Sequence, residues 1–120
     1  MGRSVLVADD DPAIQRILRL NLELEGYSVT AASDGVEALE SVGRARPDLV
    51  VLDVMMPRLD GLEVLRRIRE HAATAGIPVI LLTARAGAGD LWDGWRLGTD
   101  YYLTKPFDID DLLRSINRLL

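Results

Sequence analysis

The sequence predicts an α/β fold in which a parallel sheet of five strands carries helices on both faces. Apolar runs of strand length alternate with segments of helical period, and short connections join them without a linker or an internal repeat. The chain has 120 residues, and single domains commonly hold about 100–150. With 48% hydrophobic and 28% charged residues, a folded core is expected. We therefore expect one domain over residues 1–120.

The polarity of the five strand segments predicts their place in the sheet. Residues 5–8, 49–52, 79–82 and 101–104 form runs that are largely or wholly apolar. Residues 27–32 instead alternate polar and apolar side chains, as a strand solvated on one face does. We expect this strand at an edge of the sheet and the wholly apolar strands at its centre.

The segments between the strands have the period of helices. Asp11 and Pro12 open the first helix, because Pro suits a first helical turn, and Gly26 ends it. Asp34 and Asp60 precede the second and third helices. The side chains expected to face inward are Ile14, Ile17, Leu18 and Leu22, then Val36, Leu39 and Val42, then Leu62, Leu65 and Ile68, and finally Ile109, Leu112, Leu113, Ile116, Leu119 and Leu120.

Side chains suited to chemistry follow the ends of four predicted strands: Asp9 and Asp10, Asp53, Thr83, and Lys105. Ligands of open parallel sheets bind beyond the carboxyl ends of the strands, so one site is expected there. A flavodoxin-like strand order of 2-1-3-4-5 places the first and third strands side by side, which crowds the three carboxylates. Like charges so close raise each other's pKa unless a cation neutralises them. Oxygen ligands suit Mg²⁺ or Mn²⁺, so a divalent metal site is predicted.

The remaining polar groups at this edge have separate interpretations. Asp11 is expected to cap the first helix, since Asp is favoured at that position. Lys105 offers a point charge for a phosphoryl oxygen, and Thr83 offers a hydroxyl. A phosphoryl group on Asp53 would add about two negative charges, so it would need the metal, Lys105 and donors from the fourth loop.

Composition excludes or disfavours several other classes of protein. The chain has no cysteine, which excludes disulfides, thiol catalysis and Cys-based zinc sites. The single histidine, His71, cannot build a metal cluster and is expected to be solvated near the end of the third helix. A net charge of −5 disfavours direct binding of nucleic acid by this domain. No apolar run approaches the roughly 18 residues of a membrane span, so we expect no membrane contact and a cytoplasmic location.

Five motifs in fixed order give the chain a resemblance to the receiver domain of two-component response regulators. They are Val7-Ala8-Asp9-Asp10, Val51-Leu52-Asp53-Val54-Met55-Met56-Pro57, Asp60-Gly61, Leu82-Thr83-Ala84 and Lys105-Pro106-Phe107. The resemblance runs from about residue 4 to residue 120. It implies a phosphoprotein that acts as a conformational switch, whose only catalysis is its own phosphorylation and dephosphorylation.

The resemblance also implies the roles of the acidic residues. Asp53 would be the phosphoacceptor, served by a phosphohistidine on a sensor histidine kinase or phosphotransfer protein. Asp10 and Asp53 would hold Mg²⁺, for which Mn²⁺ can substitute. The backbone carbonyl of Met55 would complete the protein's share of the metal shell, and Asp9 would contribute through water.

A second group of residues would read the phosphorylated state. The resemblance implies that Lys105 pairs with the phosphoryl group and that Thr83 turns inward to bond it. Tyr102 matches the aromatic position that moves inward with the threonine, although the neighbouring Tyr101 leaves the register open by one residue. A cis peptide bond between Lys105 and Pro106 is also implied.

The chain departs from the common receiver pattern around the fourth helix. The loop 85–90 is rich in glycine, which predicts a frayed start to that helix. Trp92 and Trp95, three residues apart, form either an aromatic surface for docking or dimerisation, or part of the core. A homodimer would use the face of the fourth helix, fifth strand and fifth helix. Neither Met55 nor Arg85, at the positions that tune dephosphorylation in receivers, can position water, so a long-lived phosphorylated state is expected.

Other functions need features that the sequence does not favour. A Mg²⁺-dependent phosphohydrolase with an aspartyl nucleophile is the alternative, but 120 residues leave little material for a cap or substrate pocket. A flavin-binding module is disfavoured because Asp9, Asp10 and Asp11 would repel the flavin phosphate. Met55 and the run Thr83-Ala84-Arg85 resemble those of receivers that precede winged-helix DNA-binding domains. The chain is either a stand-alone regulator or a receiver from a longer protein.

Overall fold

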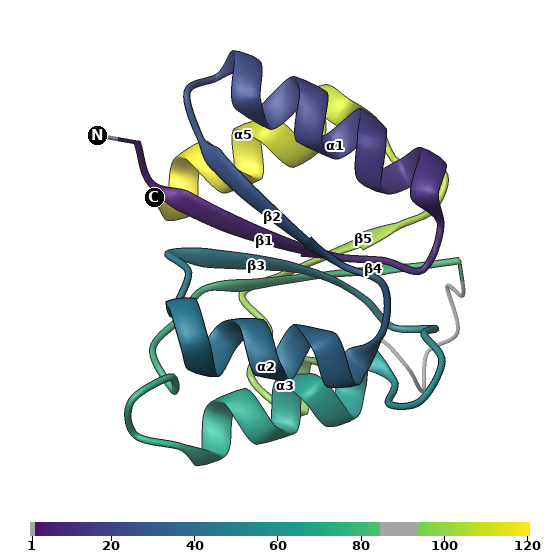
Figure 1. Cartoon of the computed structure of the whole chain (residues 1–120). Coiled ribbons are helices and arrows are strands. Elements are labelled where there is room, and N and C mark those ends of the chain that lie inside the picture. Colours follow the sequence, from purple (N-terminus) through teal and green to yellow (C-terminus); the bar gives the residue numbers. More distant parts are fainter. Residues whose placement is uncertain (1, 85–93) are drawn as a thin grey trace.

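The sheet has the predicted strand order. The computed structural model describes residues 2–84 and 94–120 and shows five parallel strands in the order β2-β1-β3-β4-β5 (Figure 1). The strands are β1 (Ser4–Ala8), β2 (Ser28–Ala32), β3 (Leu49–Asp53), β4 (Val79–Thr83) and β5 (Tyr101–Thr104). The alternating segment is β2, at one edge, and the wholly apolar segments are the central strands β1, β3 and β4, so the doubly wound fold is confirmed.

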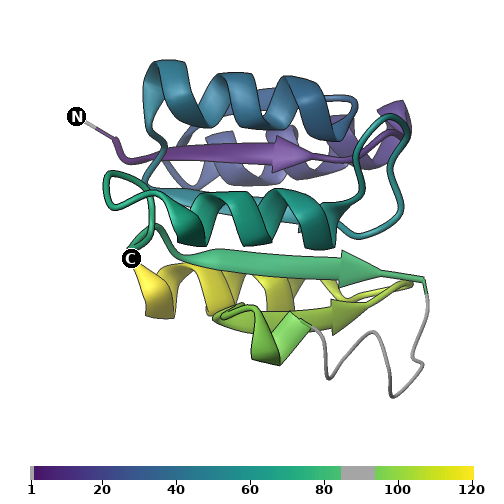
Figure 2. The ribbon, with the colours of Figure 1, turned by 90° about the horizontal axis from the view of Figure 1, so that it is seen from below.

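Helices cover both faces of the sheet. They are α1 (Pro12–Leu24), α2 (Gly35–Ala45), α3 (Gly61–Glu70) and α5 (Ile109–Leu119). Helices α1 and α5 lie on one face and α2 and α3 on the other, and the view from below shows the strands pointing the same way (Figures 1 and 2). The predicted start of a fourth helix, including Trp92 and the glycine-rich loop, falls outside the described residues; residues 94–96 are helical. No helix in the described part of the chain is long and apolar enough to cross a membrane.

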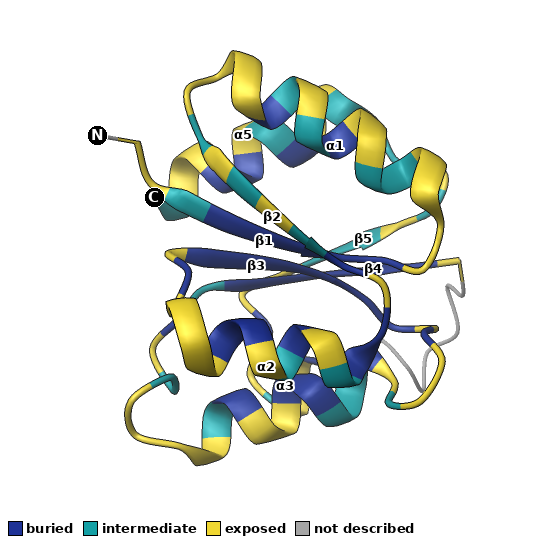
Figure 3. Cartoon of the chain, viewed as in Figure 1, coloured by how far each residue is buried: buried dark blue, intermediate teal, exposed yellow. Residues whose placement is uncertain are grey.

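Side chains from the sheet pack into two apolar layers. Alternate residues of β1 point to opposite faces: Val5 and Val7 pack with α1 and α5, while Leu6 and Ala8 pack with α2 and α3. Every residue of β3 and β4 is buried, which is why these strands are almost free of polar residues (Figure 3). The two layers fix the strand ends, and with them the loops at the carboxyl edge of the sheet.

One predicted core residue lies at the surface. Leu18 and Leu22 of α1 are fully buried against the sheet, but Ile17 is 53% exposed. Adjacent helical residues are about 100° apart around the axis, so Ile17 lies on the flank of α1 once Leu18 faces the sheet. The prediction that Ile17 faces inward was therefore wrong, and its side chain is accessible beside the carboxyl edge.

An aspartate caps each of the helices α1, α2, α3 and α5. Asp11 accepts a hydrogen bond from the Ala13 backbone amide at 2.9 Å, which confirms its predicted capping role. Asp34, Asp60 and Asp108 cap α2, α3 and α5 in the same manner. These caps satisfy amides at the helix starts, which lie at the same edge as the ends of the strands.

Candidate functional site

Strand register brings the predicted acidic residues together. Ala8 of β1 pairs with Leu52 of β3, so the next residues, Asp9 and Asp53, leave the sheet side by side. Asp9, Asp10 and Asp53 each offer a carboxylate oxygen within 4.8 Å of the others. Asp9 and Asp53 are buried, whereas Asp10 is exposed, so the cluster opens to solvent on the side of Asp10.

Lys105 reaches this cluster from the end of β5. Its Nζ lies 2.8 Å from Asp9 Oδ2 and 3.3 Å from Asp53 Oδ2. The Lys105 backbone amide donates to the Thr83 carbonyl at 2.7 Å, which ties the end of β5 to the end of β4. The Lys105-Pro106 bond is cis, as the resemblance implied. One ammonium group thus faces two buried carboxylates.

The protonation of the cluster follows from burial and from these charges. Burial and then the charge of Asp9 raise the pKa of Asp53 to about 6, although Lys105 and a backbone hydrogen bond from Met55 oppose the rise. Burial alone would lower the pKa of Lys105, but its hydrogen bond to Asp9 and the charges of Asp53 and Asp9 raise it. Lys105 is therefore a cation that neutralises only part of the acidic charge.

The backbone at Asp9 is held by a residue that the sequence reasoning missed. The Gln15 side-chain amide donates to the Asp9 carbonyl, and it lies 3.2 Å from the Ala32 carbonyl and 3.1 Å from Ser33 Oγ. The Asp9 amide also donates to Ala32 O at 3.0 Å. Gln15 thereby joins the loop after β1 to the loop after β2. In the sequence, only the position of Gln15, one helical turn after the acidic run Asp9-Asp10-Asp11, could have indicated this role.

The two tyrosines of β5 lie in different environments. Tyr102 pairs with Leu81 and packs with the apolar layer under α2 and α3, whereas Tyr101 is exposed. Thr83 is fully buried as the last residue of β4 and pairs with Thr104 of β5. Tyr102, rather than Tyr101, is therefore the inward-facing aromatic residue of β5.

Met55 lies in the loop between β3 and α3. The Val54 amide donates to Leu82 O, and the Gly61 amide donates to Val54 O, both at 2.8 Å. These bonds close the base of the loop directly after Asp53. The side chain of Met55 is 49% exposed. Arg85, the other residue expected to affect dephosphorylation, lies outside the described part of the chain. Of the two tryptophans expected near the fourth helix, Trp95 is described and is exposed.

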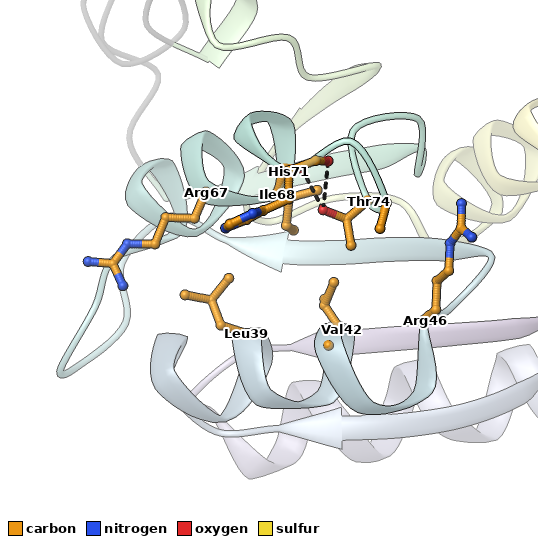
Figure 4. A pocket seen from close by; sticks show the side chains of 9 residues that line it. Leu39, Val42, Arg46, Arg67, Ile68, His71 and Thr74 are labelled. Atoms are coloured by element: carbon orange, nitrogen blue, oxygen red, sulfur yellow. Dashed lines mark hydrogen bonds between the residues drawn. The ribbon is translucent and has the colours of Figure 1, made fainter.

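Two cavities differ in their relation to the acidic cluster. One of about 470 Å³ between α2 and α3 has an apolar wall, with Arg46 and Arg67 at opposite ends (Figure 4). His71, at the end of α3, is exposed beside it, as expected of a solvated residue. The second, of about 510 Å³, includes Lys105. Its full lining is Ile14, Ile17, Ala84, Lys105, Pro106, Phe107 and Ile109. An accessible apolar surface therefore adjoins the acidic cluster.

The donor set at the cluster fits a hard divalent cation. Three carboxylates lie within reach of one another, and Mg²⁺ and Mn²⁺ prefer such oxygen ligands. One of the three, Asp10, is open to water, which Mg²⁺ usually retains in its shell. The site can thus combine buried carboxylates, a lysine and a cation at one edge of the sheet.

Comparisons with known proteins all indicate the same family. Residues 5–117 match the model of the response regulator receiver domain. The chain is 51% identical over 116 residues to the response regulator MprA of Mycobacterium leprae (strain TN), covering 97% of the chain and 50% of that protein. It is 43% identical to the DNA-binding dual master transcriptional regulator RpaA of Synechocystis sp., covering 97% and 48%. The chain spans about half the length of these curated relatives.

Solved structures show the same architecture. The receiver domain of the Francisella response regulator 1452 is 40% identical, with a TM-score of 0.91 over 98% of this chain and 96% of that one. The receiver domain of sensor histidine kinase PA1611 from Pseudomonas aeruginosa PAO1 is 35% identical, with a TM-score of 0.90 over 99% and 98%. That structure has a magnesium ion coordinated in its active-site cleft. The chain belongs to the response regulator receiver domains, the phosphoacceptor switches of two-component signalling.

Proposed function

We propose that this receiver accepts a phosphoryl group on Asp53 in a Mg²⁺-dependent reaction. The observation that carries the proposal is the position of the buried Asp53 carboxylate, within 4.8 Å of Asp9 and Asp10 and 3.3 Å from the Lys105 ammonium. Bound Mg²⁺ would neutralise charge on the transferring phosphoryl group. Asp10, Asp53 and the Met55 carbonyl would hold the ion, with Asp9 acting through water and Mn²⁺ serving as a substitute.

The reaction itself is a single transfer between two residues. A carboxylate oxygen of Asp53 forms a bond to phosphorus as the bond from phosphorus to the donor imidazole breaks, and the leaving imidazole takes up a proton. Lys105, now bonded to Asp9, would pair with an oxygen of the new phosphoryl group. Burial and Asp9 raise the pKa of Asp53 to about 6, and the positive charge of a bound cation would oppose that rise and favour the ionised, nucleophilic form.

Thr83 and Tyr102 would carry the switch from the acidic cluster to the surface. Thr83 is buried at the end of β4, beside the strand that ends at Asp53. Tyr102 packs inward on the adjacent strand, where its ring lies against Gly94: a Cβ on Gly94 would be 3.5 Å from Tyr102 Cδ2. Movement of Thr83 toward a phosphoryl group would free space for Tyr102, which couples the charge to residues 94–96.

The partner that supplies the phosphoryl group would be a sensor histidine kinase or phosphotransfer protein. The apolar surface of Ile17 and Phe107 beside Lys105 supports this, because a phosphohistidine must be brought to a buried carboxylate. The exposed Tyr101 and Trp95 support a homodimer through β5, α5 and the segment before β5.

Three further expectations stay predictions. The domain itself would not bind nucleic acid, because its net charge is −5; DNA binding such as that named for RpaA would belong to another part of a longer protein. The exposed Met55 offers no group to position water, so the phosphorylated state should be long-lived. A cytoplasmic location is expected from the sequence.

A Mg²⁺-dependent phosphohydrolase is not favoured, since the matched relatives are response regulators.

Intact mass spectrometry tests the acceptor directly. Wild-type protein incubated with Mg²⁺ and acetyl phosphate should gain one phosphoryl group, whereas Asp53→Asn should not. Asp11→Asn is the matched control, because Asn keeps the helix cap and leaves the cluster intact. An unmodified wild type, or an undiminished adduct in Asp53→Asn, would overturn the assignment.

A further inference from the structure

An ion pair joins the loop after β2 to the loop after β3. Arg58 Nη2 lies 2.8 Å from Asp34 Oδ2, and Arg58 Nε lies 3.0 Å from the same oxygen. The other oxygen of Asp34 accepts the Glu37 amide at 2.8 Å as the cap of α2. The Asp34 side chain is only 13% exposed. Asp34 therefore holds Arg58 from a fixed position at the start of a helix.

The backbone around Arg58 needs such support. Arg58 has a φ of 66°, in the left-handed region that costs a non-glycine residue about 1 kcal/mol or more. The next residue, Leu59, lies against Gly35: a Cβ at Gly35 would be 2.0 Å from the Leu59 carbonyl oxygen. The Leu59 amide donates to Pro57 O at 2.7 Å, which tightens the turn. The tip of this loop is thus packed onto the start of α2.

The same loop carries Met55 next to the acidic cluster. Its base is closed by the Gly61 amide bonded to Val54 O, and its tip is held by the Arg58-Asp34 pair. Met55 lies between these two anchors, and a backbone hydrogen bond from Met55 reaches the Asp53 carboxylate. A shift of the tip would therefore move the Met55 backbone relative to Asp53.

We propose that Asp34 and Arg58 are positioning residues for the divalent-cation site, since their ion pair holds the 54–60 loop with the Met55 backbone at the acidic cluster. This inference rests on the proposed function, in which the Met55 backbone carbonyl is a ligand of the cation. It assigns a task to two residues that lie outside the cluster of Asp9, Asp10 and Asp53.

The expected effect is on cation affinity rather than on folding. Partly exposed ion pairs contribute little to stability, so the fold should survive their loss. Partners that orient metal ligands typically change metal affinity by about 10–100-fold. Arg58 acts through the loop backbone rather than on a ligand directly, so we expect a weakening of about three- to tenfold.

Calorimetric titration with MgCl₂ would measure this effect on Asp34→Asn and Arg58→Asn. Asn keeps the cap at position 34 and tolerates the left-handed backbone at position 58, so each change mainly removes the ion pair. Both variants should bind Mg²⁺ about three- to tenfold more weakly, and the double variant should be no weaker than either one. Arg58→Lys, which keeps the charge without the planar fork, should be intermediate.

Kinetics with acetyl phosphate separate positioning from chemistry. The Mg²⁺ concentration at half-maximal rate should rise in the variants, while the rate at saturating Mg²⁺ should stay close to that of wild type. Arg66→Gln is the matched control, because it removes the exposed ion pairs of Arg66 with Glu63 and Glu70, outside the 54–60 loop. It should bind Mg²⁺ as wild type does.

The possible outcomes distinguish a failure of the proposed function from a failure of this inference alone. If wild type binds no Mg²⁺, the proposed function fails and the inference fails with it. If wild type binds Mg²⁺ and all ion-pair variants bind it equally well, only the role of Asp34 and Arg58 is overturned. A fall in maximal rate at unchanged half-saturation would also overturn it. If either Asn variant unfolds by circular dichroism, the comparison of Arg58→Lys with wild type decides.

Discussion

The Lys105 ammonium lies 2.8 Å from Asp9 Oδ2, although 96 positions separate the two residues in the sequence. Its distance to Asp53 Oδ2 is longer, at 3.3 Å. In the unmodified protein, Lys105 therefore neutralises Asp9 more directly than Asp53. Burial and the charge of Asp9 raise the pKa of Asp53 to about 6, because the more distant Lys105 offsets only part of their effect.

Replacing Asp53 by Asn should stabilise the metal-free protein, and more so at higher pH. The pKa of Asp53 is about 6 in the folded protein against a reference of 3.8, so the folded state binds the proton more tightly. This contribution to stability is fully present below the reference pKa and is lost as the pH rises through the folded value. Asn does not titrate, so its advantage over Asp should be about 2 kcal/mol greater near pH 7.5 than near pH 4.5.

Denaturant unfolding in EDTA would measure the pH effect. The quantity compared is the difference in the free energy of unfolding between Asp53→Asn and wild type at each pH. Asp48→Asn, at the other end of β3 where Asp48 accepts a hydrogen bond from the Ser4 amide, is the control that removes a carboxylate outside the cluster. A difference for Asp53→Asn that does not change with pH would contradict the raised pKa.

Substitution of two neighbouring aspartates should change the stabilisation of the protein by Mg²⁺ to different extents. Asp10 belongs to the carboxylate cluster, whereas Asp11 caps α1 through Ala13. A ligand at 100 times its dissociation constant stabilises a folded protein by about 2.7 kcal/mol. Adding Mg²⁺ should therefore raise the melting temperature of wild type and of Asp11→Asn, and that rise should be largely lost in Asp10→Asn.

Thermal melting followed by circular dichroism, with and without EDTA, checks this pair. Equal responses of Asp10→Asn and Asp11→Asn would show that Asp10 does not hold the cation. NaCl at the same ionic strength serves as a comparison for non-specific screening of the acidic charge.

The acidic cluster could be predicted from sequence because its members directly follow apolar strands. Asp9, Asp53 and Lys105 need only a parallel sheet and a strand order to be brought together, and the alternating polarity of β2 indicated the sheet edge. Their grouping depends on backbone topology, which local patterns of polarity largely determine.

The residues that hold the cluster could not be predicted in the same way. The Asp34-Arg58 pair joins two loops, and its formation depends on the left-handed turn at Arg58 and on the direction of a long side chain. Gln15 has three acceptors that come from two loops. For Ile17, the helical period predicts which side of α1 faces the sheet. It does not distinguish a residue at the centre of that side, which is buried, from a residue at its flank, which is exposed.

The exposed flank of α1 should matter for phosphotransfer from a protein donor. Ile17 lines the cavity beside Lys105, so Ile17→Ser should slow transfer from a phosphorylated histidine kinase domain by about tenfold or more. Phosphorylation by acetyl phosphate should be unchanged, because a small donor needs no docking surface. Gel autoradiography with the phosphorylated kinase domain would measure the first rate and intact mass the second.

Leu24→Ser provides the matched control for Ile17→Ser. Like Ile17, Leu24 is an exposed aliphatic residue on α1; it is 75% exposed, against 53% for Ile17. Leu24 lies at the C-terminal end of the helix. It should leave both rates unchanged. Equal slowing by the two substitutions would show that docking does not depend on the surface beside Lys105.

The close approach between Gly61 and Asp53 should make the first residue of α3 intolerant of any side chain. A Cβ at Gly61 would lie 2.2 Å from the Asp53 carbonyl oxygen and 2.9 Å from its carbonyl carbon. Both are backbone atoms of a buried central strand, so they cannot move aside as a side chain could. Gly61→Ala should therefore lower the free energy of unfolding by about 1–3 kcal/mol and weaken Mg²⁺ binding by displacing Asp53.

Gly43→Ala is the matched control because Gly43 lies inside α2, where an added Cβ meets none of the described atoms within 4 Å. Ala is favoured over Gly in a helix by about 1 kcal/mol, so this change should stabilise the protein and leave Mg²⁺ affinity unchanged. Urea unfolding and calorimetric titration with MgCl₂ measure the two quantities. If both substitutions stabilised the protein, α3 could shift away from β3 without cost, and the position of Asp53 would not depend on Gly61.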